Sequence, residues 1–298
     1  MMSQFLTLLV SGLSLGCIYA LIALGFVVVF KATRVVNFTH GSLVLLGAYV
    51  VGRTHDHLGF VRAVLLGVAV AAVGGALVEL LLIRRVRHAD LGTLAILTLG
   101  VDILLATELT RRIGTDVLTL GDPWGASVVQ VGGVRLPQAR IVAAAVALLL
   151  LSGFLAAFRF SDWGIAMRAA AEHAETASLM GIRLGWVAAS AWALAGALAA
   201  AAGLFFTAFP SPGINAGVGL AALGVAVPAA VLGGLDSTSG ALVGGLVLGV
   251  ASTLAAGYQD QLAFLGRGLG SVVPYAVMVL VLLVRPSGLF GTKEVHRV

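Results

Sequence analysis

The stretch RFSDWGIAMRAAAEHAETASLMGIRLGW, residues 159–186, stands out because it is polar in a chain that is otherwise strongly apolar. The 298 residues are 60% hydrophobic and only 10% charged, and their mean hydropathy is +1.07. A soluble domain of this length needs more charged surface, so the composition predicts an integral membrane protein. The quoted stretch is too polar to cross a membrane, and it therefore marks a water-facing segment.

Apolar runs on both sides of this stretch predict an all-α, polytopic membrane protein with about eight or nine transmembrane helices. Some runs are shorter than the roughly 20 residues that a full crossing needs, which predicts tilted, broken or re-entrant segments. No separate soluble domain is expected, so residues 1–298 are predicted to form one transmembrane domain. The nine predicted segments are Phe5–Phe30, Phe38–Val51, Val61–Ile83, Leu91–Glu108, Ile141–Phe158, Trp186–Phe209, Gly219–Gly234, Ser239–Ala256 and Val272–Val284.

The distribution of lysine and arginine predicts the orientation of these segments. With the C-terminus in the cytoplasm, the loop 159–185 is also cytoplasmic, and the N-terminus and the loop 109–140 lie outside. The net charge of +5 then reflects membrane topology, and no nucleic-acid binding is expected. No basic region precedes the first apolar run, so no cleavable signal peptide is expected. This arrangement places 11 of the 18 basic residues in inner loops, namely Lys31, Arg34, Arg84, Arg85, Arg87, Arg159, Arg168, Arg183, Arg285, Lys293 and Arg297.

The polar stretch itself has the signals of a helix over Asp162–Met180. Ser161 is a good N-cap residue and Gly181 is a typical C-terminal stop. Alanine and methionine recur at helical spacing and form a narrow stripe, while Arg168 and Glu172 are expected to form an i, i+4 pair. The stripe lacks the large side chains that anchor a helix in lipid. Two interpretations remain, a helix that docks on a cytoplasmic partner and a solvated connector between spans.

A longer stretch, GIAMRAAAEHAETASLMGIRLGWVAASAWALAGALAAAAG (residues 164–203), resembles the cytoplasmic coupling loop and following helix of ABC-importer permeases of the branched-chain amino acid type, the LivH-like group. Three further stretches resemble this family in the same order: VVNFTHGSLVLLGAYV (35–50), AVLGGLDSTSGALVGGLVLGV (230–250) and LVLLVRPSGLFGTKEVHRV (280–298). The resemblance covers nearly the whole chain and is weakest over Arg111–Arg140. In the coupling loop the matching positions are Gly164, Ala166, Arg168, Ala169, Ala171, Glu172, Ala177, Gly181 and Ile182.

This resemblance implies a permease without an ATPase of its own, and neither Lys31 nor Lys293 lies in a Gly-x-x-x-x-Gly-Lys-Ser/Thr loop. It implies two cytoplasmic ATP-binding subunits that hold ATP and Mg, a second related permease in a homo- or heterodimer, and an extracytoplasmic substrate-binding protein. The setting would be a bacterial cytoplasmic (inner) membrane and the mechanism alternating access. The chain would bind no cofactor and would not be an enzyme. Its contacts with the ATPase would involve Arg168, Glu172, Ala177 and Gly181.

Polar residues inside the predicted spans are candidates for the substrate pathway or for structural roles. Asp102 lies midway along the fourth segment, where a carboxylate indicates either a hydrogen bond to a neighbouring helix or a group near the pathway. Thr98 and Thr107 are polar residues of the same segment and are possible hydrogen-bond partners of Asp102. Asn37 is placed to cap the second segment. His40 titrates near neutrality, but a lone histidine more often packs or forms hydrogen bonds than carries protons.

Small residues and proline supply further candidates. Gly41 permits a close helix approach. Pro228 stands inside the seventh segment, which predicts either a broken helix that lines the pathway or a simple kinked helix. Gly233 and Gly234 end the same segment. Glu79, near an inner end, is expected to form an ion pair with one of the arginines that follow it.

Two other functional classes stay open. An ion-coupled secondary transporter should have two comparable halves and several intramembrane carboxylates, but only Asp102 qualifies. A membrane-embedded enzyme should have clustered catalytic side chains, and the one tight cluster, His55, Asp56 and His57, falls in a short outer loop. The single cysteine, Cys17, excludes an intrachain disulfide. The substrate also stays open: branched-chain or related hydrophobic amino acids, or the urea and short amides associated with near relatives of the family.

Overall fold

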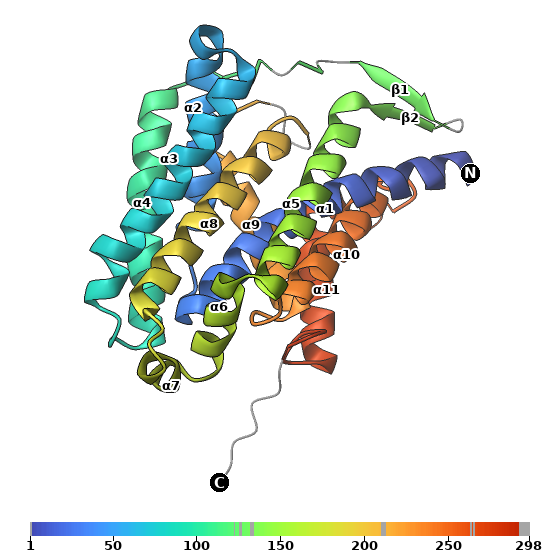
Figure 1. Ribbon diagram of the computed structural model, residues 1–298. Helices are drawn as coiled ribbons and strands as arrows, with labels where there is room; N and C mark the ends of the chain where they lie inside the picture. The colour runs from blue at the N-terminus through green and yellow to red at the C-terminus, as the bar shows by residue number, and fades with distance from the viewer. Residues whose placement is uncertain are drawn as a thin grey trace.

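The computed structural model describes residues 2–121, 123–124, 127–131, 134–209, 213–262, 264 and 266–291. Over these residues each of the nine predicted segments overlaps one helix, which confirms the predicted all-α, polytopic fold (Figure 1). The helices are α1 (Met2–Thr33), α2 (His40–Leu58), α3 (Phe60–Leu81), α4 (Leu91–Ile113), α5 (Gln138–Phe160), α8 (Leu184–Phe206), α9 (Val218–Gly233), α10 (Thr238–Gly257) and α11 (Leu269–Val284).

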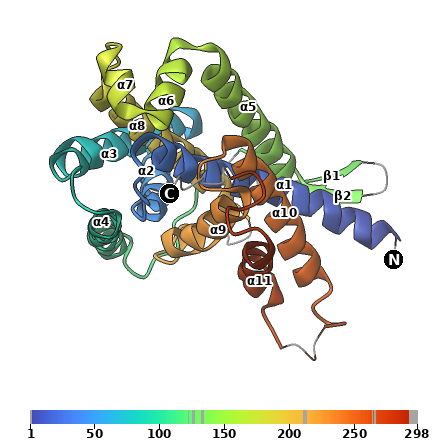
Figure 2. The same ribbon diagram turned by 90° about the horizontal axis from the view of Figure 1, so that it is seen from below.

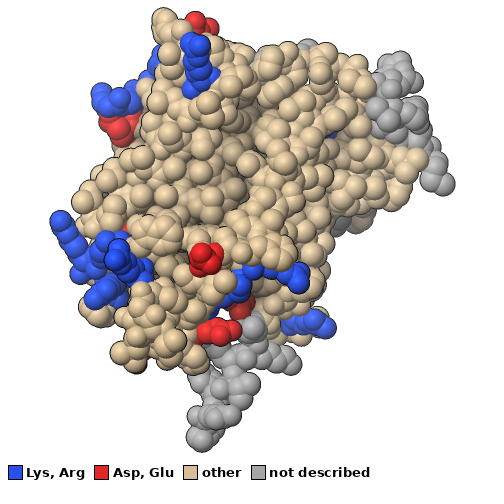
Figure 3. All heavy atoms as spheres, viewed as in Figure 1, with Lys and Arg blue, Asp and Glu red and all other residues tan. Residues whose placement is uncertain are grey.

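The helices have the length and composition of membrane spans. In the described part of the chain six of them, α1, α3, α4, α5, α8 and α10, are long and apolar enough to cross a membrane. The helices α9 and α11 are apolar but shorter, at 16 residues each, or about 24 Å. Charged side chains gather at the two ends of the visible face and leave a largely uncharged band between them (Figure 3). The chain is therefore a multi-pass membrane protein.

The first helix forms the centre of the bundle. The side chains from Ile18 to Leu24 are buried, and α1 packs against α5, α8, α9 and α10 (Figure 2). Small residues bring α1 and α10 together. A Cβ atom on Gly245 would lie 2.3 Å from the main-chain nitrogen of Ala20, and one on Gly249 would lie 2.3 Å from the Cα of Gly16. Helices in lipid gain their association from such close backbone packing.

The two ends of the bundle differ. One end carries two short helices, α6 (Asp162–Glu172) and α7 (Ala174–Leu179), and we call it the elbow end (Figure 1). The C-terminal ends of α1, α3, α5, α9 and α11 lie there, and the segment after α11 returns to α9 through the hydrogen bond from Leu289 N to Leu232 O at 2.9 Å. The other end, the hairpin end, carries the antiparallel strands β1 (Val128–Val131) and β2 (Val134–Pro137).

The hairpin was missed in the sequence, where 109–140 was predicted only as an outer loop. Two valine-rich runs flank Gly132–Gly133, which is a typical hairpin composition. The sequence GDPWG, residues 121–125, is typical of a turn and lies partly outside the described residues. Its Trp124 is described, and its ring lies 5.3 Å from that of Phe60 and 5.9 Å from that of Phe205. The hairpin end is thus fastened to the bundle by aromatic contacts.

Candidate functional site

The polar stretch between α5 and α8 forms an elbow of two helices, so the prediction of one helix over Asp162–Met180 is wrong. The helix breaks at His173, whose backbone is extended (φ −143°, ψ 89°). In the last turn of α6, the carbonyl of Ala171 accepts a hydrogen bond from Arg34 Nη2 at 3.2 Å. Because Arg34 supplies a hydrogen-bond donor to this carbonyl, a further turn of α6 is not needed to supply one. The sequence offered no sign of this partner, which lies 137 positions away.

The first half of the elbow is held firmly against α5 and α8. Ser161 caps α6 by accepting a hydrogen bond from Gly164 N at 3.1 Å. A side chain at Gly164 would collide with the carbonyl of Phe158, since its Cβ would lie 2.1 Å from that oxygen. Met167 is wholly buried, and Trp163 Nε1 donates to Ser190 Oγ on α8 at 2.8 Å. The helix α6 therefore moves with the spans on either side of it.

The side chain of Arg168 points back to α5. It donates hydrogen bonds to the carbonyls of Phe158 and Arg159, and its guanidinium lies 5.3 Å from the Phe158 ring. A cation at the C-terminal end of a helix is favourable because that end carries partial negative charge. Among the described residues no ion pair joins Arg168 to Glu172, so the predicted i, i+4 pair is wrong. Glu172 is left exposed on the elbow.

The second half of the elbow carries exposed apolar side chains. Ala177 is buried, and its carbonyl accepts a hydrogen bond from Ile182 N at 3.0 Å. Gly181 adopts a left-handed conformation (φ 87°), as the predicted C-terminal stop requires. Leu179 and Met180 are 88% and 80% exposed. Met180 was predicted to belong to the narrow apolar stripe, whereas Leu179 was not a candidate in the sequence, so the structure adds this exposed pair.

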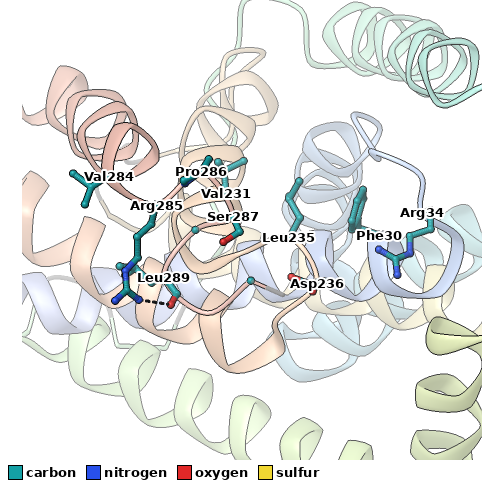
Figure 4. Close-up of a pocket in the computed structure, with 12 residues that line it drawn as sticks. Phe30, Arg34, Val231, Leu235, Asp236, Val284, Arg285, Pro286, Ser287 and Leu289 are labelled. Atoms are coloured by element: carbon teal, nitrogen blue, oxygen red, sulfur yellow. Dashed lines mark hydrogen bonds between the residues drawn. The ribbon is translucent and has the colours of Figure 1, made fainter. Parts of the chain in front are cut away.

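Beside the elbow a groove of about 960 Å³ opens at the same end of the bundle (Figure 4). The end of α1, the turn after α9 and the segment after α11 form its walls. Arg34 and Asp236 lie on one side and Arg285 on the other (Figure 4). Lys31 Nζ donates to the carbonyl of Asp236 at 2.8 Å, which fastens α1 to the turn. Because Arg34 contacts both groove and elbow, the two surfaces are continuous.

The glycine pair predicted near the pathway shapes this groove. A Cβ on Gly233 would lie 2.1 Å from the carbonyl oxygen of Gly240, and Gly234 has a positive φ of 105°. Only glycine suits such a turn. Phe290 N donates to the carbonyl of Gly233 at 3.0 Å. The structure therefore places the pair at the elbow end. Further along α9 the helix continues through Pro228 without interruption, so it is not broken there.

The start of α2 is capped by α4. Asp102 Oδ1 accepts a hydrogen bond from Ser42 N at 3.0 Å and another from the Ser42 hydroxyl. Thr98 Oγ1 accepts from Phe38 N at 3.2 Å. A carboxylate near a helix N-terminus satisfies first-turn N–H groups and the partial positive charge there. The hydrogen bonds of Asp102 thus join α4 to α2. Its partner is Ser42 on α2 and not one of the threonines of α4.

Two candidates beside this cap are buried without partners. The N-cap residue of α2 is Thr39, so the prediction that Asn37 caps the helix is wrong. Neither polar atom of the Asn37 amide nor either ring nitrogen of His40 has a hydrogen-bond partner among the described residues. The His40 ring lies edge-on to Phe26 at 6.4 Å. Gly41 packs against α9, where its Cβ would lie 2.6 Å from the carbonyl of Gly219.

Two further predicted groups are placed by the structure. Glu79 is buried and forms a two-pronged ion pair with Arg84, with Nη2–Oε2 at 2.8 Å and Nε–Oε1 at 3.1 Å, which confirms the predicted pair. Arg84 also donates to the carbonyl of Gly185 at 2.5 Å, which links α3 to α8. The prediction that His55, Asp56 and His57 lie in a short outer loop is wrong, because they belong to the C-terminal end of α2. His55 contacts Asp56 at 3.2 Å, but the described part of the chain contains no group of three His, Cys, Asp or Glu side chains that could hold a metal ion.

Comparison with known proteins agrees with this architecture. The family described as the permease component of the branched-chain amino acid transport system matches residues 8–282. The high-affinity branched-chain amino acid transport system permease proteins LivH of Salmonella typhimurium and Escherichia coli K12 are each 34% identical to this chain, over 99% of it and 98% of their own length.

A further relative is BraD of Pseudomonas aeruginosa, a permease protein of the same description, which is 30% identical over 99% of this chain and 98% of its own length. No solved structure matches the chain. The match to the family extends over the elbow and the cap of α2, and over the groove walls formed by α1 and the turn after α9. The chain belongs to the family of branched-chain amino acid transport system permease components.

Proposed function

We propose that this chain is the permease subunit of an ATP-driven importer of branched-chain or related hydrophobic amino acids. It would act by alternating access in the bacterial cytoplasmic membrane. The family of the chain and the names of its relatives support this substrate class. ATP and Mg would be held by two separate ATP-binding subunits, because the chain has no phosphate-binding loop. A second permease subunit and an extracytoplasmic binding protein complete the assembly.

The observation that carries this proposal is the exposed apolar pair Leu179 and Met180 on a firmly held elbow. Large apolar side chains on a water-facing surface indicate a protein interface. The elbow and the groove beside it form one surface at the elbow end, and the ATP-binding subunit would bind there. Closure of the ATP-binding subunits would move α6, and α6 would move α5 and α8 through its buried contacts.

The orientation follows from this role, with the elbow end in the cytoplasm, the C-terminus inside and the N-terminus outside. The distribution of charge supports it. Nine arginines and lysines of the described residues belong to the elbow end, namely Lys31, Arg34, Arg84, Arg85, Arg87, Arg159, Arg168, Arg183 and Arg285. Positively charged loops stay on the cytoplasmic side of a membrane.

The test is the exchange Leu179→Glu, with Leu179→Met as the matched control. The glutamate should abolish co-purification of the ATP-binding subunit and leucine uptake, while the chain still inserts in the membrane. The methionine should preserve both, because it keeps the apolar surface. A second variant, Gly181→Val, strains the left-handed turn and should lower uptake without loss of insertion.

Three outcomes would contradict the proposal. Normal uptake by Leu179→Glu would exclude the elbow as the docking surface. Loss of insertion would show that the elbow is needed for folding rather than docking. Uptake by the wild type that follows an ion gradient and needs no ATP would make the chain a secondary transporter. The same vesicles, offered urea and short amides, test the remaining substrate classes.

A further inference from the structure

A second cavity, of about 670 Å³, lies among the ends of α5, α9, α10 and α11 that face the hairpin end, with α1 as its inner wall. Sites for small molecules typically measure about 300–1,000 Å³. None of the polar residues that line this cavity was a candidate in the sequence. Its lining combines apolar side chains such as Leu15, Phe206 and Val225 with the polar side chains of Arg140, Ser252 and Tyr275.

Two of these polar groups have no hydrogen-bond partner within the described residues. Ser252 is only 5% exposed, and its hydroxyl oxygen is buried and unpaired. The Nε of Arg140 is also buried and unpaired, and the guanidinium lies 5.2 Å from the centre of the Phe209 ring. Buried polar groups are nearly always satisfied in native proteins. Two unsatisfied groups on one cavity therefore indicate a polar ligand.

The charge at this cavity favours an anion. Among the described residues that line it, Arg140 is the one charged residue and none is acidic. The helices α9 and α11 both begin here, since the lining includes Gly217, the N-cap of α9, and Gly270 and Ser271 in the first turn of α11. Helix N-termini carry partial positive charge and unpaired N–H groups, which bind carboxylates.

The cavity also offers acceptors for an ammonium group. Pro228 has no N–H, so the carbonyl of Gly224, four residues earlier in α9, loses its intrahelical donor. Gly224 lines the cavity, and a Cβ atom built on it would lie 2.8 Å from the Tyr275 hydroxyl. A guanidinium, a carbonyl without its helical donor and an apolar wall together match a zwitterionic amino acid with an apolar side chain.

We propose that this cavity is the place where the transported amino acid rests inside the permease. Arg140 binds its α-carboxylate, and Gly224 O and Ser252 Oγ accept hydrogen bonds from its ammonium group. This inference rests on the proposed function and narrows it, because it requires a free carboxylate on the solute and so disfavours urea and simple amides. Leu220 and Tyr275 are exposed at the rim, where the second permease would close the cavity against lipid.

The first test compares leucine uptake by proteoliposomes that contain the complete transporter. Arg140→Gln should lower uptake at least about tenfold, because charge-assisted bonds to carboxylates are among the strongest in proteins. Uptake by Arg140→Lys should lie between that of the wild type and that of Arg140→Gln. Arg267→Gln, which removes an exposed arginine near the same end and outside the lining, should leave uptake unchanged. Normal uptake by Arg140→Gln overturns this inference alone. A wild type that moves no branched-chain amino acid overturns the proposed function and this inference together.

The second test does not depend on transport and also serves if Arg140→Gln fails to assemble. Ser252→Cys is made in a Cys17→Ala background, so that it is the single thiol of the chain. Its reaction with an anionic methanethiosulfonate is followed in the complete transporter. Leucine should slow the labelling at least several-fold, and leucinamide, which lacks the carboxylate, should not. Equal labelling with and without leucine, or equal protection by leucinamide, overturns the site.

Discussion

Arg34 directly after α1 donates a hydrogen bond to the carbonyl of Ala171 in the last turn of α6, so the buried central helix of the bundle is tied to the elbow. The guanidinium also lies 5.9 Å from the ring of Phe30, and the Arg34 backbone is left-handed, at φ 57°. A non-glycine residue in this conformation is uncommon, and such positions concentrate where structure serves function.

Removal of this link should weaken coupling between ATP hydrolysis and transport. Arg34→Ala is expected to lower the number of leucine molecules imported per ATP by about 2- to 30-fold, which corresponds to coupling of about 0.5–2 kcal/mol. ATP hydrolysis itself should continue, because the elbow keeps its contacts to α5 and α8. The control is Arg87→Ala, an exposed arginine of the same end. An unchanged ratio of transport to hydrolysis in Arg34→Ala would show that the bond is incidental.

Asp102 should be replaceable by asparagine but not by an apolar residue. Asn keeps an oxygen that accepts from Ser42 N, whereas Leu leaves that first-turn N–H of α2 without a partner. The loss should destabilise the solubilised protein by about 1–3 kcal/mol. Thermal unfolding in detergent measures it, and Asp102→Asn is the matched control. If Asp102→Asn retains stability but loses uptake, the carboxylate has a role in transport beyond the cap.

The number and approximate positions of the spans followed from the sequence, because apolar runs and lipid thickness are local quantities. The end of the second span did not, since α2 continues past the predicted Val51 to Leu58. Partners distant in the chain did not follow from it. Asn37 was a reasonable cap by residue type, but Asp102, 60 residues away from Ser42, supplies the acceptor. The i, i+4 spacing of Arg168 and Glu172 fitted an ion pair, but the carbonyls of α5 lay closer to the guanidinium.

No motif in the sequence indicated the proposed solute cavity. Arg140, Gly224 and Ser252 belong to three helices, and each has an ordinary structural interpretation when read alone. Only the packing of α5, α9 and α10 around α1 brings them to one cavity. Pro228 was noticed in the sequence as a helix breaker, whereas its effect in the structure is to release a single carbonyl within a continuous helix.

Acid should destabilise α4 through its cap. Asp90 is the N-cap residue, and hydrogen bonds from the hydroxyl and amide of Thr93 hold the pKa of its carboxyl below the ordinary value of 3.8. A lowered pKa in the folded state stabilises the protein above the unfolded value, and this contribution disappears as the pH falls through the folded pKa. Asp90→Asn, which keeps the cap, should therefore lose less of its Tm between pH 7 and pH 3 than the wild type. Equal losses in the two proteins would exclude Asp90 as a source of acid sensitivity.

The glycines where α3 and α8 approach most closely should not tolerate replacement by a residue with a side chain. A Cβ on Gly75 would lie 2.4 Å from the carbonyl oxygen of Trp192, and one on Gly196 would lie 2.2 Å from that of Ala71. Gly75→Val and Gly196→Val must force the helices apart, at a cost of about 1–3 kcal/mol or more. Gly100→Ala is the control, because its Cβ would meet nothing within 4 Å and alanine favours the helix.

Thermal unfolding in detergent should thus rank Gly100→Ala at or above the wild type and both valine variants well below it. Because Arg84 links α3 to Gly185 on α8 at the elbow end, separation of these helices should also disturb the elbow. The valine variants are therefore expected to bind less ATP-binding subunit per folded molecule than the wild type does. Binding in proportion to the folded fraction would mean that the α3–α8 contact stabilises the fold without positioning the docking surface.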